Sequence, residues 1–141
     1  MTATPIHTIG RKFIAVLIVA AVSAFISACQ PSGPTTPPEG SAEREAIFAA
    51  MRQGRAIQDQ VFVVRDFKVQ NGWAWVTADP QSKDGSQHYE TESWLLQKTG
   101  DTWDTWKVVA QPCAEEGCEP KAEIAKMRQR FPDAPEAIFP K

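Results

Sequence analysis

The chain has 141 residues, of which 43% are hydrophobic and 23% are charged, and its formal net charge is −2. These proportions are ordinary for a globular protein and argue against a chain that is disordered throughout. Residues 1–28 hold two basic and no acidic side chains, so the rest of the chain carries 13 basic and 17 acidic ones, a net charge of −4. A mildly acidic chain without a basic stripe argues against nucleic acid as a partner. The length suits one small domain plus a tail.

The first 28 residues are typical of a secretion signal. Arg11 and Lys12 precede ten apolar residues at 13–22, a stretch too short to span a bilayer comfortably. Residues 26–29 read ISAC and resemble the lipobox of bacterial lipoproteins, in which the cysteine accepts a lipid and becomes the first mature residue. We therefore predict a signal peptide at 1–28 and lipidation of Cys29. The alternatives are an ordinary signal cleaved after Ala28 or an uncleaved anchor.

This resemblance implies a protein of the cell envelope that is attached to a membrane through its N-terminal lipid. In a Gram-negative host the expected place is the periplasm-facing side of the outer membrane. With Cys29 lipidated, Cys113 and Cys118 remain as an even pair in an oxidising compartment, and we predict a disulfide between them. A metal site at this pair would need two further ligands, and no other cysteine or nearby histidine is present, so we predict no metal.

After the cysteine, residues 30–41 hold four prolines and two glycines and no large apolar side chain. We predict that 29–41 is an acylated, proline-rich tether and that 42–141 forms a single domain. A helix is expected from residue 42 to about Gly54, with Ser41 as its N-cap and Ile47, Phe48 and Met51 at helical spacing.

The periodicity then changes from helical to alternating. Four strands are expected, at 61–70, 73–78, 89–98 and from Trp103 or Trp106 to 111. Asn71-Gly72 favours a tight hairpin between the first two. Short connections predict an antiparallel meander.

A final helix is expected to open at Pro120 and to stop before Pro132, with Ile138 and Phe139 of the tail reaching the core. The fold class is therefore α+β: an N-terminal helix, a four-stranded antiparallel meander and a C-terminal helix, with the helices covering one sheet face.

A conceivable chemical site lies at the start of the third strand. His88, Glu90 and Glu92 share one parity, and a histidine with two carboxylates is a possible metal or acid–base set. Trp94 and Leu96 continue that parity, so a strand with a solvated outer end and a buried inner end is the simpler interpretation. We predict no catalytic residue and no cofactor, since the chain also lacks a Gly-x-Ser-x-Gly nucleophile elbow.

The tryptophans offer the other candidate site. Trp73 and Trp75 point to one side of their strand, while the small side chains of Ala74 and Val76 point to the other. Large aromatic residues in a sheet are more often core than binding surface. If the helices pack on the small side, however, both tryptophans lie on an open face, and we name them as candidate binding residues on that basis.

The segments FVVRDFKV, GWAWVTADP, WLLQK, WKVVA and PDAPEAIFP together resemble a family of small exported bacterial proteins. The resemblance covers about residues 44–140, and it implies no catalytic residue; the cysteine pair is not part of the family pattern. The order of a helix followed by a curved sheet is also similar to cystatin-like and nuclear-transport-factor-like folds, by analogy of fold only.

These observations favour a membrane-anchored envelope lipoprotein whose small, non-enzymatic domain binds an envelope protein or helps assemble the envelope. The first alternative is a carrier or sensor of a small ligand, with a pocket between sheet and helix. An apolar cavity beside the tryptophans would favour the carrier or sensor, and a filled core would exclude it. The second alternative is an enzyme that uses His88 with Glu90.

Overall fold

The computed structural model describes residues 33–57, 59–100, 105–113 and 118–141. The predicted signal peptide and Cys29 lie outside these residues. The described part belongs to one compact unit that runs to the C-terminus. Within it, no helix is long and apolar enough to cross a membrane.

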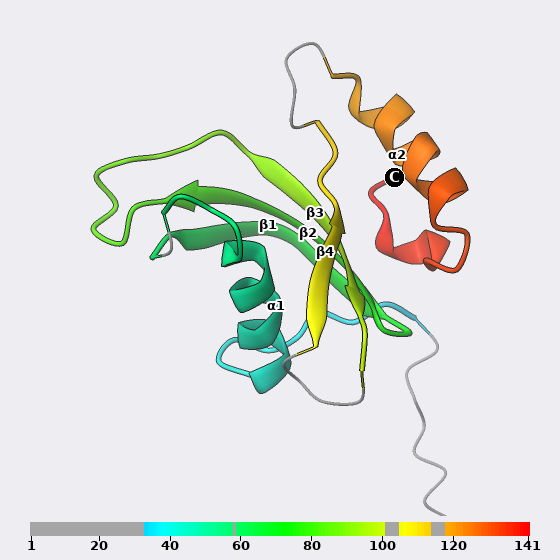
Figure 1. The fold of residues 1–141 in the computed structure, drawn as a ribbon, viewed down its shortest axis with the longest axis horizontal. Helices are drawn as coiled ribbons and strands as arrows, with labels where there is room; N and C mark the ends of the chain where they lie inside the picture. Colours follow the sequence, from blue (N-terminus) through cyan, green and yellow to red (C-terminus); the bar gives the residue numbers. More distant parts are fainter. Residues whose placement is uncertain (1–32, 58, 101–104, 114–117) are drawn as a thin grey trace, which may run out of the picture. The chain divides into compact units, whose positions relative to one another are not determined.

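The α+β meander predicted from the sequence is confirmed (Figure 1). All neighbouring strands are antiparallel, and the spatial order β1-β2-β3-β4 follows the chain. The elements are α1 (Ala42–Arg52), β1 (Val61–Gln70), β2 (Trp73–Gln81), β3 (Glu92–Lys98), β4 (Trp106–Ala110), α2 (Pro120–Arg130) and the 3₁₀ helix η1 (Glu136–Ile138).

Local chemistry explains where these elements begin and end. The Ser41 hydroxyl accepts a hydrogen bond from the backbone N–H of Arg44, which caps α1 as expected. Asn71 and Gly72 have φ angles of 51° and 76°, the left-handed geometry that a two-residue hairpin requires. The third strand is three residues shorter than predicted, because it begins at Glu92 rather than at residue 89.

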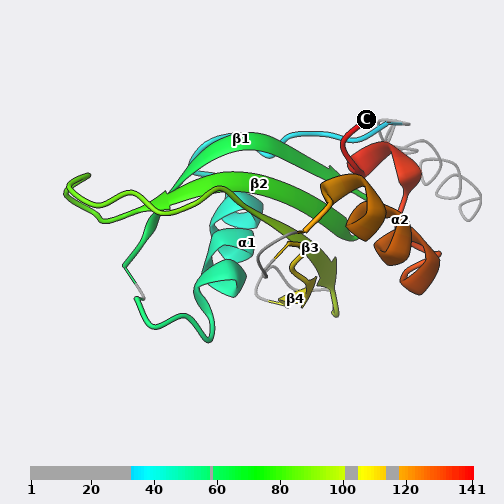
Figure 2. The same ribbon diagram turned by 90° about the horizontal axis from the view of Figure 1, so that it is seen from above.

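The prediction that both helices cover one sheet face is wrong (Figures 1 and 2). The small side chains of β2, Ala74 and Val76, belong to the core cluster under α1. Trp73 and Trp75 belong to a second cluster with α2 and the C-terminal tail on the opposite face. The sheet therefore forms the middle of three layers.

The predicted tether also needs correction, because part of it is bound to the domain. Thr35 and Val69 exchange two backbone hydrogen bonds of 2.9 and 2.7 Å at the outer edge of β1. The Thr36 hydroxyl donates to the carbonyl of Phe67 at 2.7 Å, and Pro37 is buried. The folded domain thus begins at Thr35 and not at residue 42. We call residues 35–37 the strap.

Candidate functional site

The tryptophan face is part of the core, so the hypothesis of an exposed aromatic pair is wrong. Trp73 is 6% exposed and Trp75 is 1% exposed. Their rings pack against Phe131 and Phe139, with centroid distances of 5.8 and 5.5 Å. The physical reason is that the tail after α2 carries large apolar side chains, which cover the face that the sequence left open. The binding role assigned to these two tryptophans therefore loses its structural basis.

The structure does not bring His88, Glu90 and Glu92 together as one site. His88 and Glu90 are exposed in the connection between β2 and β3, and His88 forms only an isolated bridge with Gln81. Glu92 instead accepts two hydrogen bonds from the guanidinium of Arg55, at 2.7 and 2.8 Å. Across the described residues, no group of three or more histidine, cysteine or acidic side chains is placed to hold a metal ion.

The Arg55–Glu92 pair joins the segment after α1 to the sheet. The hydrogen bond to Glu92 raises the pKa of Arg55 above its usual value and outweighs the opposing effect of burial. The same guanidinium donates to Gln60 at 2.7 Å and lies over the Trp94 ring, 5.8 Å from its centroid. A carboxylate with a bidentate arginine partner is typical of a structural brace rather than of a proton-transfer group.

The predicted cysteine pair is brought to bonding distance. Cys113 and Cys118 are joined in the structure, with their Cα atoms 5.0 Å apart. They lie between β4 and α2, just before the helix that covers the tryptophan face. The bond therefore lies just before α2, the helix whose Met127 belongs to the second core cluster.

A different surface has the features of a binding site: the first half of β1, residues 61–65, which we call the β1 edge site. β1 is an edge strand, and no other described strand or bridge pairs with the outer edge of these residues. Val61 and Val63 are 38% and 45% exposed, among the most exposed large apolar side chains of the described chain. They alternate with Phe62 and Val64, which pack on the α1 side, so they lie on the sheet face that the C-terminal tail covers near Trp73 and Trp75.

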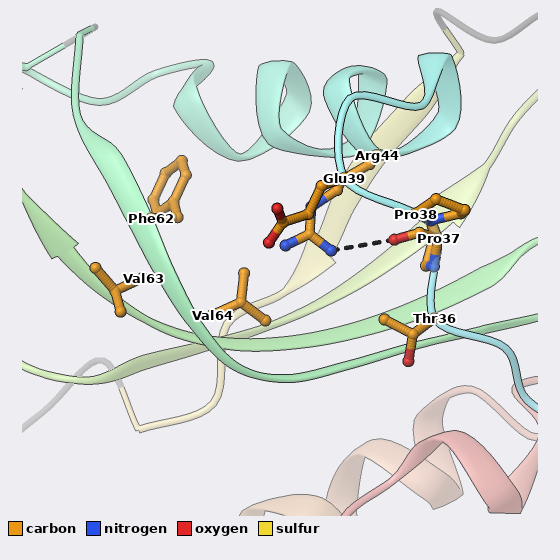
Figure 3. A pocket seen from close by; sticks show the side chains of 8 residues that line it. All are labelled: Thr36, Pro37, Pro38, Glu39, Arg44, Phe62, Val63 and Val64. Carbon is orange, nitrogen blue, oxygen red and sulfur yellow. Dashed lines mark hydrogen bonds between the residues drawn. The ribbon is translucent and has the colours of Figure 1, made fainter.

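An open groove lies along this strand on the side of α1 (Figure 3). Its volume is about 580 Å³. Its walls come from two segments: the strap and the residues after it on one side, and β1 on the other. The lining residues are Thr36, Pro37, Pro38, Glu39, Arg44, Phe62, Val63 and Val64.

Arg44 is the cation of the groove. Its guanidinium donates to the carbonyl of Pro37 at 3.1 Å (Figure 3) and lies over the rings of Phe48 and Phe67, 5.2 Å from each centroid. These contacts fix the side chain between α1, the strap and the core. A guanidinium carries five N–H donors in a rigid plane, so one held in this way is suited to recognising a partner's carboxylate or carbonyl.

On the side toward β2, the exposed valines are bordered by the polar side chains of Arg65, Asp79 and Thr91, which we call the polar rim. Arg65 forms a salt bridge of 2.7 Å with Asp79, and the Thr91 hydroxyl donates to the same carboxylate at 2.6 Å. The hydrogen bond from Thr91, followed by that from Arg65, lowers the pKa of Asp79 below its usual value. Asp79 is therefore charged at neutral pH, as is Arg65. An apolar centre with a polar border is the usual anatomy of a protein-binding surface.

Sequence reasoning missed the β1 edge site because four consecutive apolar residues, VFVV at 61–64, give no alternation. Such a run is typical of a strand buried on both faces. Only Phe62 is buried, while Val64 is half-buried and Val61 and Val63 are exposed.

Comparison of the chain with protein-family models, curated proteins and solved structures found no match.

Proposed function

We propose that this protein is a lipid-anchored protein of the cell envelope whose small domain, without enzymatic activity, binds another protein through the β1 edge site. The anchor rests on the ISAC motif at 26–29 and the charged, apolar segment before it. The binding role rests on one observation: Val61 and Val63 are exposed beside the Arg65–Asp79 salt bridge and an open groove.

The partner is expected to dock by side-chain contacts rather than by adding a strand. The pairing of β1 with β2 is irregular between Val64 and Asp66, and a bulge of this kind bends an edge away from regular pairing. The charged side chains of Arg65 and Asp66 follow at once. These features protect the edge against strand addition while leaving the valines accessible.

A small-ligand carrier is less well supported. Its expected pocket lay beside the tryptophans, and Phe131, Ile138 and Phe139 pack into that region. The groove along β1 is open to solvent and shared between apolar and polar side chains. Small-molecule sites are usually concave and enclose most of the ligand surface, which an open groove at a strand edge does not do.

The anchor is tested by metabolic labelling with a fatty acid in the native host. We expect label on the wild-type chain and none on Cys29→Ser, which lacks the acceptor thiol. The apolar run and its two cations are unchanged in that variant, so export still begins and the unprocessed precursor accumulates. Label on the serine variant would overturn the lipobox assignment.

The binding surface is tested with a photo-reactive amino acid placed at Val63 in the envelope of living cells. Val108 on β4 is a matched control, because it is an exposed valine of similar accessibility, 37%, at the opposite edge of the sheet. We expect a discrete crosslinked species from position 63 and none from position 108. The yield of this crosslinked species should fall when Arg65→Glu is added, because a negative side chain at position 65 repels the Asp79 carboxylate and removes the salt bridge. Equal crosslinking at both positions would contradict a specific site.

A further inference from the structure

The strap limits how far the domain can stand from the membrane. We infer that five residues, 30–34, connect Cys29 to the folded domain at Thr35, and not the twelve-residue spacer, 30–41, that the composition suggests; we call this connection the leash. This inference rests on the proposed lipid anchor at Cys29.

The strap is bound by contacts that do not depend on one another. Thr35 is paired with Val69 through both backbone groups, and Thr36 adds a side-chain hydrogen bond to Phe67. Arg44 holds the carbonyl of Pro37, which is buried. Backbone pairing, a hydroxyl bond, a guanidinium contact and apolar burial therefore act together on three consecutive residues, so the chain is attached to the sheet from Thr35 onward.

Chain geometry converts this attachment into a distance. A fully extended chain spans at most about 3.3–3.6 Å per residue, so Thr35 lies within about 20 Å of the lipid-bearing residue. A tether that was free up to Ser41 would allow about 40 Å. The strap thus halves the reach of the anchor.

The position of the strap on β1 also limits the distance of the β1 edge site from the lipid-bearing residue. The strap pairs at Val69, near the β1–β2 hairpin, whereas Val63 lies six residues earlier on the same strand. The step across the Thr35–Val69 pair adds about 5 Å and the six residues of β1, at about 3.4 Å each, add about 20 Å, so Val63 stands at most about 45 Å from the lipid-bearing residue. The partner's docking surface must lie in this layer. A protein embedded in the same membrane fits best, because both molecules then share that layer at a raised effective concentration.

The leash is tested by energy transfer from one fluorophore on the mature, lipidated chain to acceptor-labelled lipid in phosphatidylglycerol–phosphatidylethanolamine vesicles. The fluorophore is attached at Gln129→Cys, an exposed position at the end of α2. The strap is released with Thr35→Pro, Thr36→Ala and Pro37→Gly together with Arg44→Ala, which remove the N–H donor, the hydroxyl donor, the buried ring and the guanidinium that binds the Pro37 carbonyl. Pro34→Ala is the matched control, because Pro34 is exposed just before the strap.

We expect the released variant to show clearly less energy transfer than wild type, and Pro34→Ala to match wild type. Six residues inserted between Ser32 and Gly33 should lower the transfer to the level of the released variant. Equal transfer in wild type and the released variant, with an acyl chain confirmed by intact mass, would overturn the leash and leave the anchor standing. An intact mass without an acyl chain would overturn both.

Discussion

The sheet is covered by a core cluster on each of its two faces, and Trp75 is buried in the second of them. Replacing Trp75 with alanine should therefore destabilise the domain severely. The indole is 1% exposed, packs on Phe139 at 5.5 Å and donates its Nε1 hydrogen to the Thr77 hydroxyl at 3.0 Å. Truncating a buried tryptophan typically costs about 3–5 kcal/mol, through lost burial and the cavity that remains. Small domains are stable by only about 5–15 kcal/mol in total.

Thermal unfolding followed by circular dichroism measures this effect. At about 4–6 °C per kcal/mol for a domain of this size, we expect Trp75→Ala to lower the midpoint by about 15–25 °C. Trp75→Phe keeps an aromatic ring but loses the hydrogen bond to Thr77, and should cost about 1–2 kcal/mol. Val63→Ala is the surface control and should stay within about 0.5 kcal/mol of wild type.

Pairing Trp75→Ala with Phe139→Ala tests the source of the cover. Because the two rings are in contact, the double variant should be less destabilised than the sum of the singles, by at least about 0.5 kcal/mol. Strict additivity would mean that the tail does not pack on this ring. A fall of less than about 5 °C for Trp75→Ala alone would show that the tryptophan face is open, and the three-layer arrangement would then be wrong.

Three further predictions concern groups outside that cluster. Cys113→Ser should lower the free energy of unfolding by up to about 2 kcal/mol, as estimated for so short a closed loop, and wild type should gain two alkylatable thiols only after reduction. Asp79 has a lowered pKa, so its stabilising contribution is present above its unfolded pKa of about 3.8 and is lost as the pH falls through the folded pKa. Urea unfolding should therefore find Asp79→Asn less stable than wild type at pH 6, with a difference that shrinks as the pH falls below 3.8; a difference independent of pH would exclude the carboxylate as its cause. Arg55→Ala should cost about 1–3 kcal/mol, because it leaves the half-buried Glu92 carboxylate with the Gln111 amide but without its cation, and Arg55→Lys should recover only part, because an ammonium cannot form the bidentate pair; full recovery would contradict the bidentate geometry.

The sequence by itself determined the elements and their order, because these depend on neighbouring residues. Alternating apolar residues on either side of Asn71-Gly72 predict the first hairpin, and Ser41 before a helical pattern predicts the start of α1. The two later cysteines, with four residues between them in a chain predicted to be exported, predict their bond. Each of these signals lies within about ten residues, so no knowledge of the rest of the fold is required.

Only the tertiary structure decided which faces are covered, since that depends on segments far apart in the chain. The sequence of β2 does not tell whether Trp75 faces solvent, because the answer is given by Phe139, 64 residues later. Proline-rich composition likewise predicts a free tether, whereas Thr35 pairs with Val69, a contact no local pattern encodes. The β1 edge site follows from the same cause: Val63 is exposed because Phe131, Ile138 and Phe139 pack around Trp73 and Trp75, and Val63 does not belong to that cluster.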